Sequence, residues 1–213
     1  MSDARILTVA EMRAADRYTI EKGTPSAVLM RRAAQGIFEA FSAWKDHRIL
    51  IVCGSGNNAG DGYALAEILK NNGMEPEVLC LYDRFSEDGE YYYKRCLEAG
   101  VTILKDFPNT VNFSEYDIIV DCMLGTGFSG TPREPIAGAI QAINKARESG
   151  AFVICADINS GMNGDTGEGE IAVKSDLTVS IGYLKPGFFR ESAKDLIGKL
   201  VNADIGIEIP EKP

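Results

Sequence analysis

Residues 49–62 read Ile49-Leu50-Ile51-Val52-Cys53-Gly54-Ser55-Gly56-Asn57-Asn58-Ala59-Gly60-Asp61-Gly62. The five apolar residues are expected to form a buried strand, and the glycine-rich turn is expected to open a helix near residues 61–63. Backbone N–H groups at a helix start favour an anion, so this order predicts a phosphate site. The turn also carries Asn57, Asn58 and Asp61, which a phosphate cradle alone does not need. Chemistry or ion binding is therefore expected there as well.

Strand-like and helical segments alternate along the rest of the chain. Strands are expected at 49–53, 77–82, 101–104, 117–122, 151–156, 177–182 and 199–203. Helices are expected at 61–72, 87–99, 134–148 and 190–195, after two earlier helices at 8–18 and 26–43. This alternation, with continuous apolar runs in the strands, predicts an α/β fold with a mostly parallel sheet covered on both faces. We expect one domain over residues 1–213, with the helices of 8–43 packed on the α/β core.

The composition indicates which classes of binding partner are excluded. The chain has 213 residues, 45% of them hydrophobic, and a net charge of −9. This acidic balance argues against a nucleic-acid surface or an anionic membrane surface. The N-terminal segment is charged, so no signal peptide is expected, and no apolar run is long enough to span a bilayer. A cytoplasmic location is expected.

Cysteine and histidine usage excludes several kinds of site. The five cysteines lack a C-x-x-C spacing, and most lie in apolar strand-like runs, which indicates buried free thiols in a reducing compartment. The single histidine, His47, lies in a polar stretch before the first strand of residues 49–53. A Ser-His-Asp triad or a multi-histidine metal site is therefore excluded, and acid–base work is left to Asp, Glu, Lys or Tyr.

Four predicted strands end in polar or glycine-rich residues. In a parallel sheet these ends share one rim, where ligands bind. The loop Gly125-Thr126-Gly127-Phe128-Ser129-Gly130 offers free N–H groups to a phosphate or pyrophosphate. Asn58, Asp121 and Ser160 come from three strand ends and could enclose a hard monovalent or divalent cation, which takes oxygen ligands. Asp157 and Lys185 are candidates for proton transfer.

A dinucleotide-dependent dehydrogenase is the competing interpretation. The stretch Gly54-x-Gly56-x-x-Ala59 fits a relaxed dinucleotide fingerprint, and Asp83 follows the second predicted strand as a ribose-binding acid would. Asp61, however, would repel a pyrophosphate at the helix start. A P-loop is excluded because no Lys-Ser/Thr pair follows the glycines.

Taken together, the motifs resemble the NAD(P)H-hydrate epimerases, the N-terminal-domain type of nicotinamide-nucleotide repair enzyme. The resemblance covers nearly the whole chain and is carried by several segments: Val9-Ala10-Glu11-Met12, Leu29-Met30, residues 56–62, Asp121 with Gly125-Thr126-Gly127, Asp157-x-x-Ser160-Gly161, Lys185 and Asp204-Ile205-Gly206-Ile207. It implies a Rossmann-like three-layer αβα fold, commonly dimeric. The implied activity interconverts the R and S epimers of hydrated NADH or NADPH (NADHX and NADPHX), and a separate or fused dehydratase then restores the S form.

The resemblance also implies roles for particular residues. The dinucleotide would be lined by Asn57, Asn58, Ala59, Gly60 and Asp61, by Gly125, Thr126, Gly127, Phe128, Ser129, Gly130 and Thr131, and by Asp157. Asn58, Asp121 and Ser160 would hold one potassium ion (K+). Asp157 would transfer the proton while Lys185 tunes or orients it. An oxidoreductase using intact NAD(P) and a non-catalytic nucleotide-binding scaffold of the same fold remain as alternatives.

The chain departs from the family pattern at a few positions. The family usually has Gly at Ala59, Arg or Lys at Ser129, and Pro at Asn159. Ala59 would matter if that residue needs a positive φ. Ser129 lacks a charge that could pair with phosphate, and Asn159 is expected to loosen the loop before Ser160.

Overall fold

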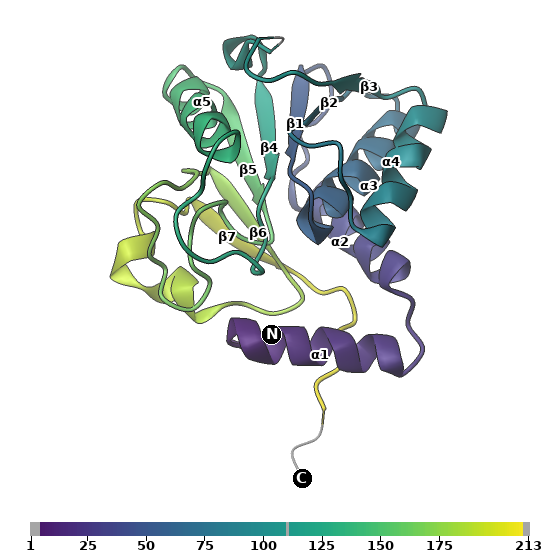
Figure 1. Ribbon diagram of the computed structural model, residues 1–213, viewed down its shortest axis with the longest axis vertical. Helices are drawn as coiled ribbons and strands as arrows, with labels where there is room; N and C mark the ends of the chain where they lie inside the picture. The colour runs from purple at the N-terminus through teal and green to yellow at the C-terminus, as the bar shows by residue number, and fades with distance from the viewer. Residues whose placement is uncertain (1–4, 110, 211–213) are drawn as a thin grey trace.

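A single seven-stranded parallel sheet forms the centre of the molecule (Figure 1). The computed structural model describes residues 5–109 and 111–210. The strands lie in the order β3-β2-β1-β4-β5-β6-β7, and every neighbouring pair is parallel. Their bounds are β1 Ile49–Cys53, β2 Glu77–Cys80, β3 Thr102–Leu104, β4 Ile118–Cys122, β5 Phe152–Ala156, β6 Leu177–Ile181 and β7 Lys199–Ala203. The strand order reverses direction between β1 and β4, which makes their carboxyl ends the switch point where ligands bind in such sheets.

Helices cover both faces of the sheet, which confirms the predicted Rossmann-like three-layer α/β sandwich. One face carries α2 (Ser26–Ala40), α3 (Asn57–Asn71) and α4 (Glu87–Glu98), and the other carries α5 (Ile136–Glu148). The side chains of β1 alternate between the two cores: Ile49 and Ile51 face the first, and Leu50 and Val52 face the second. All five residues of β1 are buried, as expected for a strand covered on both sides.

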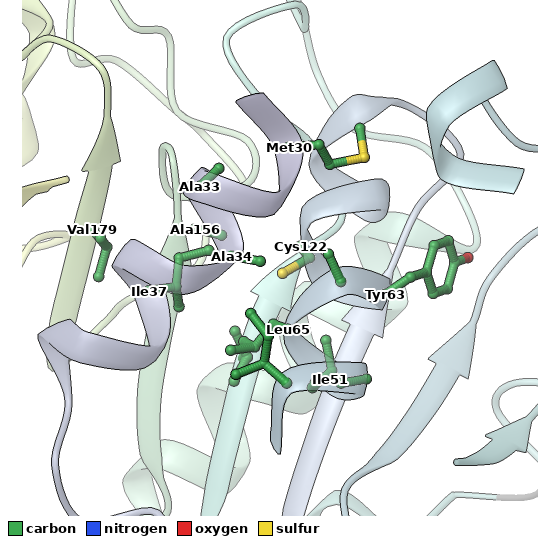
Figure 2. Close-up of a cluster of buried hydrophobic side chains, with 14 of the residues drawn as sticks. Met30, Ala33, Ala34, Ile37, Ile51, Tyr63, Leu65, Cys122, Ala156 and Val179 are labelled. Atoms are coloured by element: carbon green, nitrogen blue, oxygen red, sulfur yellow. The ribbon is translucent and has the colours of Figure 1, made fainter. Parts of the chain in front are cut away.

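Small residues let α2 lie close to α3 and to the sheet. Figure 2 shows Ala33, Ala34 and Ile37 of α2 directed toward Leu65 of α3 and toward Ala156 and Val179 of the strands. The Ala34 and Ile37 side chains are fully buried. A helix with this stripe of alanines cannot leave the sheet without exposing the apolar surface on both sides of the contact.

Helix α1 (Val9–Glu21) crosses one end of the sheet rather than covering a face (Figure 1). It begins with the predicted capping box, in which Thr8 and Glu11 satisfy each other's backbone N–H groups. Its N-terminus is tied down because Val9 N–H donates to Asp165 Oδ1 at 2.9 Å. Toward its other end the Thr19 hydroxyl accepts the Glu208 N–H at 2.9 Å. These contacts fix α1 above the carboxyl ends of the strands.

Some predicted boundaries were wrong. Helix α3 begins at Asn57, with Gly56 as its N-cap, so the glycine turn is only three residues long and both asparagines are helical. The helix expected at 190–195 is a single 3₁₀ turn, Glu191–Ala193, because only Ala193 of that stretch is buried. The five cysteines are buried free thiols, as predicted.

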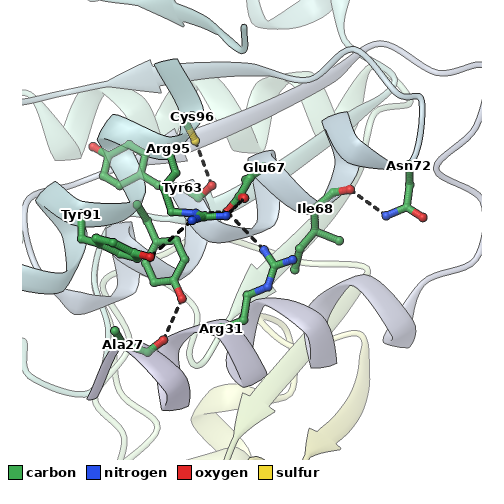
Figure 3. Close-up of polar contacts among 10 residues, drawn as sticks. Ala27, Arg31, Tyr63, Glu67, Ile68, Asn72, Tyr91, Arg95 and Cys96 are labelled. Atoms are coloured by element: carbon green, nitrogen blue, oxygen red, sulfur yellow. Dashed lines mark hydrogen bonds and ion pairs between the residues drawn. The ribbon is translucent and has the colours of Figure 1, made fainter. Parts of the chain in front are cut away.

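A buried carboxylate joins α2, α3 and α4 (Figure 3). Arg95 of α4 holds Glu67 of α3 through two hydrogen bonds, 3.0 Å to Oε2 and 2.5 Å to Oε1. Arg31 of α2 reaches the same carboxylate at 3.3 Å. The Glu67 side chain is only 5% exposed, whereas both arginines reach solvent. The hydrogen bonds from Arg95 hold the pKa of Glu67 below its usual range.

Replacing this carboxylate is expected to destabilise the protein in a pH-dependent way. Glu67→Gln should lower the free energy of unfolding by about 2 kcal/mol at neutral pH. Because the folded-state pKa is lowered, the contribution of Glu67 is present above the unfolded-state pKa and is lost as pH falls through the folded-state pKa. Urea unfolding at a series of pH values from 7 downward should therefore show a difference from the parent protein that is largest at pH 7 and shrinks as the pH falls.

The matched control is Glu191→Gln, which removes a carboxylate from the exposed Glu191–Lys194 pair. Surface ion pairs contribute little, so this variant should stay within about 0.5 kcal/mol of the parent protein. Equal effects of the two substitutions would show that the Glu67 network has no special role in stability.

Candidate functional site

A pocket of about 870 Å³ opens at the switch point between β1 and β4. The turn after β1, the loop after β4 and the first residue after β5 line it, and α1 contributes Met12, Arg13 and Asp16. Its volume is in the range of small-molecule and cofactor sites. The predicted meeting of separate strand ends at one rim is thus present in the structure.

Asp157 and Lys185 form a tight ion pair at this rim. Asp157 follows β5 with φ of 64°, a left-handed conformation that turns its carboxylate toward the loop after β4. Lys185 Nζ donates to Asp157 Oδ1 at 2.6 Å, to Ser180 Oγ at 3.1 Å and to the Ile181 carbonyl at 2.9 Å. These three acceptors use the three protons of the ammonium group. Lys185 is fully buried beneath Asp157, so its fixed charge orients the carboxylate.

The second oxygen of Asp157 remains at the pocket surface. Asp157 Oδ2 accepts the Thr126 N–H at 3.2 Å, and the side chain is 16% exposed. A carboxylate oxygen has room for one further hydrogen bond in this geometry. Asp157 thus presents one carboxylate oxygen to the pocket, whereas Lys185 contacts the pocket only through Asp157.

Asn58, Asp121 and Ser160 also come together, behind the wall of the pocket. Ser160 donates to Asp121 twice, from Oγ at 2.6 Å and from N–H at 2.8 Å. Asn58 Nδ2 donates to the Leu124 carbonyl at 3.0 Å, and Ser160 Oγ accepts the Leu124 N–H at 2.9 Å. Burial raises the pKa of Asp121, against the hydrogen bonds from Ser160. The three predicted ion ligands thus share one buried cluster around the backbone of Leu124.

Asn58 Oδ1 is the unusual atom of this cluster. It is buried, and no hydrogen-bond partner is found for it among residues 5–109 and 111–210. An unpaired buried carbonyl oxygen is costly, and such an atom in a native protein calls for a ligand or water. An oxygen-seeking cation would satisfy it.

Asp61 and Asp16 add negative charge to the pocket. Burial, followed by repulsion from Asp157, raises the pKa of Asp61 well above its usual value. The same two causes, in the same order, raise the pKa of Asp16. The Asp61 side chain comes from the fifth residue of α3 and lines the pocket, and no hydrogen bond to its carboxylate is found within the described part of the chain. Such an arrangement costs stability and is typical of functional sites.

Neutralising Asp61 is therefore expected to stabilise the folded protein. Asp61→Asn should raise the free energy of unfolding by about 1 kcal/mol or more at pH 8, because an ionised carboxylate is no longer buried without a partner. A raised folded-state pKa means that stability is present below the unfolded-state pKa and is lost as pH rises through the folded-state pKa. The gain should therefore fade at pH 4 in urea-unfolding experiments. A loss of stability at pH 8 would contradict this account of the carboxylate.

Most of the residues predicted to line a dinucleotide do line the pocket. They are Asn57, Asn58, Asp61, Gly125, Thr126, Gly127, Phe128, Ser129, Gly130, Thr131 and Asp157. Ala59 and Gly60 do not, because both pack inward in the first turn of α3 and their N–H groups are directed to the Gly56 carbonyl. Ala59 has no positive φ, so its methyl group brings no backbone strain.

The dehydrogenase interpretation loses its ribose-binding acid. Asp83 does not line the pocket; its side chain is 80% exposed and is paired with Lys105. Its neighbours Tyr82 and Arg84 line the pocket instead, and so does Arg133 before α5. The sequence reasoning missed these three residues and the α1 residues Arg13 and Asp16. Arg13 and Asp16 are three residues apart and lie on one face of α1, and this spacing could have indicated that they line a site together.

Asn159 tightens its loop, contrary to expectation. Its fully buried amide donates to the Val173 and Leu196 carbonyls, each at 2.9 Å, and to Ser175 Oγ at 3.1 Å. Its carbonyl oxygen accepts the Thr178 hydroxyl at 2.7 Å. These bonds replace the rigidity that a proline would bring to the segment before Ser160.

Two negative findings apply to the described residues. Over 5–109 and 111–210 no helix has the length and apolar character needed to cross a membrane. The same ranges contain no cluster of three or more His, Cys, Asp or Glu side chains suited to a metal ion.

Comparisons with known proteins agree with this geometry. Residues 26–187 match the family model described as YjeF-related protein N-terminus. The chain is 37% identical to the NAD(P)H-hydrate epimerase of Lentilactobacillus buchneri over 208 residues, which cover 94% of both proteins. It is 36% identical to the bifunctional NAD(P)H-hydrate repair enzyme Nnr of Archaeoglobus fulgidus, covering 87% of this chain and 38% of that protein.

A solved structure supports the fold. The crystal structure of yeast Ynu0 superposes with a TM-score of 0.75 at 22% identity, covering 86% of this chain and 82% of that one. The family match extends from the start of α2 to Gly187 and so includes both polar clusters of the rim. The relatives of this chain over nearly the full length include an NAD(P)H-hydrate epimerase. The chain belongs to the family of YjeF-related N-terminal domains.

Proposed function

We propose that this protein is an isomerase that interconverts the R and S epimers of hydrated NADH and NADPH, with Asp157 as the proton-transfer residue. The observation that carries the proposal is the Asp157–Lys185 pair at the mouth of a dinucleotide-sized pocket. Family membership and the near-full-length match to curated epimerases support the activity. The reaction is a step of nicotinamide-nucleotide repair.

The residues of the rim fit a simple acid–base route. C6 of the hydrate carries a hydroxyl next to the ring nitrogen, so loss of that hydroxyl leaves an iminium-type cation. An Asp157 carboxyl gives its proton to the leaving hydroxyl, which departs as water. Water then adds to the opposite face of C6 and loses a proton to solvent, and the Asp157 carboxylate takes up a proton from solvent before the next turnover. The buried ammonium of Lys185 keeps that carboxylate in place throughout.

We further propose that Asn58, Asp121 and Ser160 hold one K+ ion beside the bound dinucleotide. The buried Asn58 Oδ1 has no hydrogen-bond partner among the described residues and is suited to bind a cation. The Asp121 carboxylate supplies the negative charge of the site. A bound cation would add a fixed positive charge near the substrate phosphates.

Potassium is expected to stabilise the folded protein through this cluster. Thermal unfolding in KCl should give a higher Tm than in choline chloride at the same ionic strength, by about 2–4 °C for each kcal/mol of linked binding. Asn58→Leu should abolish the difference. Asn57→Ala, which changes the neighbouring exposed carboxamide, should keep it. Equal melting of the parent protein in the two salts would contradict the ion site.

Partners and location follow from the same proposal. The bifunctional relatives are named as repair enzymes and are much longer than this chain, which spans 38–42% of the length of three of them. We propose functional coupling to a separate NAD(P)H-hydrate dehydratase, a homodimeric assembly and a cytoplasmic location. The acidic net charge of −9 argues against nucleic-acid partners.

The direct test supplies the pure R hydrate and follows the S form by chromatography. We expect the protein to accelerate appearance of the S form far above the rate in buffer. No acceleration, with the hydrate still bound in calorimetry, would favour a non-catalytic scaffold. Oxidation of intact NADH by candidate carbonyl compounds, followed by absorbance, would instead favour an oxidoreductase.

A further inference from the structure

The pocket has a cationic corner that the proposed chemistry does not use. Tyr82 and Arg84 follow β2 and both line the pocket. The Arg84 guanidinium carbon lies 5.1 Å from the centroid of the Tyr82 ring. Arg84 is exposed, and no carboxylate among residues 5–109 and 111–210 forms an ion pair with it. An unpaired arginine on the wall of a pocket in an acidic protein is suited to an anionic ligand.

The residue between them points elsewhere. Asp83 pairs with Lys105 at 2.5 Å, is 80% exposed and does not line the pocket. In Rossmann-like sheets the residues that follow the second strand contact the adenosine ribose, where an acid binds the 2′-hydroxyl and an arginine accommodates a 2′-phosphate. At this position the chain turns its acid away and presents its arginine to the pocket.

The sheet order fixes which end of a dinucleotide reaches this corner. Strand β2 lies on one side of β1, whereas β4 and then β5, which carries Asp157, lie on the other. If the nicotinamide ring lies at Asp157, the adenosine end of a dinucleotide that crosses the pocket lies on the β2 side. Tyr82 and Arg84 are the side chains that this part of the pocket offers.

We propose that Arg84, stacked on Tyr82, binds the 2′-phosphate of the adenosine ribose, so that the site takes the phosphorylated hydrate, NADPHX, in preference to NADHX. This inference rests on the proposed function for the direction in which the dinucleotide lies. The guanidinium group can donate two parallel hydrogen bonds to phosphate oxygens, and its stacking on Tyr82 limits the side-chain freedom lost on binding.

Calorimetry with ADP-ribose and its 2′-phosphate tests the proposal without any epimerisation, because neither probe has a nicotinamide ring. We expect the parent protein to bind the 2′-phosphate form at least about tenfold more tightly. Arg84→Gln should reduce that preference to about twofold or less and leave the affinity for ADP-ribose nearly unchanged. Arg190→Gln removes an exposed arginine that does not line the pocket, so this control should keep the preference.

Several results would overturn the assignment. Equal affinity of the parent protein for ADP-ribose and its 2′-phosphate would contradict the assignment, and so would binding of neither probe. An equal loss of affinity for the two probes in Arg84→Gln would contradict it as well. A different result would contradict the proposed function. If the protein keeps the Arg84-dependent preference but does not accelerate epimerisation of NADPHX or NADHX, the phosphate site stands and the epimerase activity does not. Under the proposal, epimerisation by Arg84→Gln should show a raised KM for NADPHX with kcat unchanged.

Discussion

Asp157→Asn is expected to lower the rate of epimerisation by about a hundredfold or more. The amide keeps the shape of the carboxylate but can neither protonate the leaving hydroxyl nor take a proton from water. The measurement is the chromatographic rate of conversion of R to S hydrate at saturating substrate. Asp195→Asn, a change at an exposed acid outside the pocket, is the matched control and should leave the rate unchanged.

The substitution at Asp157 also affects the buried Lys185. Asp157→Asn leaves the Lys185 ammonium without its carboxylate, although Ser180 Oγ and the Ile181 carbonyl remain as acceptors. Thermal unfolding and ADP-ribose binding must therefore be measured alongside the rate. A folded variant that binds ADP-ribose normally and still turns over at the parental rate would remove Asp157 from the mechanism.

Gly54→Ala is expected to cost about 3 kcal/mol of folding free energy and to disable the site. A Cβ atom at this position would lie 2.1 Å from the carbonyl oxygen of Met123, a contact that only movement of the backbone can relieve. Gly54 also donates its N–H to the Cys122 carbonyl at 3.3 Å, so the clash falls where β1 and β4 separate to form the pocket. Urea unfolding measures the loss directly.

Gly56→Ala is the control within the same turn. A Cβ atom there meets no heavy atom within 4 Å, and Gly56 has an ordinary extended conformation with φ of −96°. Its cost should stay below about 1 kcal/mol, which reflects the weaker N-cap propensity of alanine. If both substitutions cost the same, close approach of the two strand ends is not the reason for glycine at position 54.

The sheet and most of the rim could be predicted from local sequence. Runs such as Ile49–Cys53 are long enough and apolar enough to be strands covered on both faces, and parallel strands place their polar ends together. The strand-end rule and the family resemblance both pointed to Asn58, Asp121 and Ser160, and these residues do lie in one cluster. The position of α1 could not be predicted in this way, because an amphipathic stripe shows that one face is buried but not which part of the molecule covers it.

Errors at the end of β2 show why the remaining side chains were missed. The strand was expected to reach residue 82 but ends at Cys80. Beyond a strand the alternation of side chains no longer holds, so it could not tell whether Asp83 or its neighbours would face the pocket. A difference of one residue in such a loop exchanges an acid for an arginine at the ligand.

The strand order of the sheet also determines when each strand of the nascent chain can pair during synthesis. Leaving the ribosome, β1 can pair with β2 early, but its other neighbour, β4, is translated only after α3, α4 and β3. Until then one edge of the most apolar strand is unsatisfied, a state in which aggregation competes with folding. Chaperones should therefore bind nascent chains that are arrested before residue 118, and this binding should end once β4 has emerged.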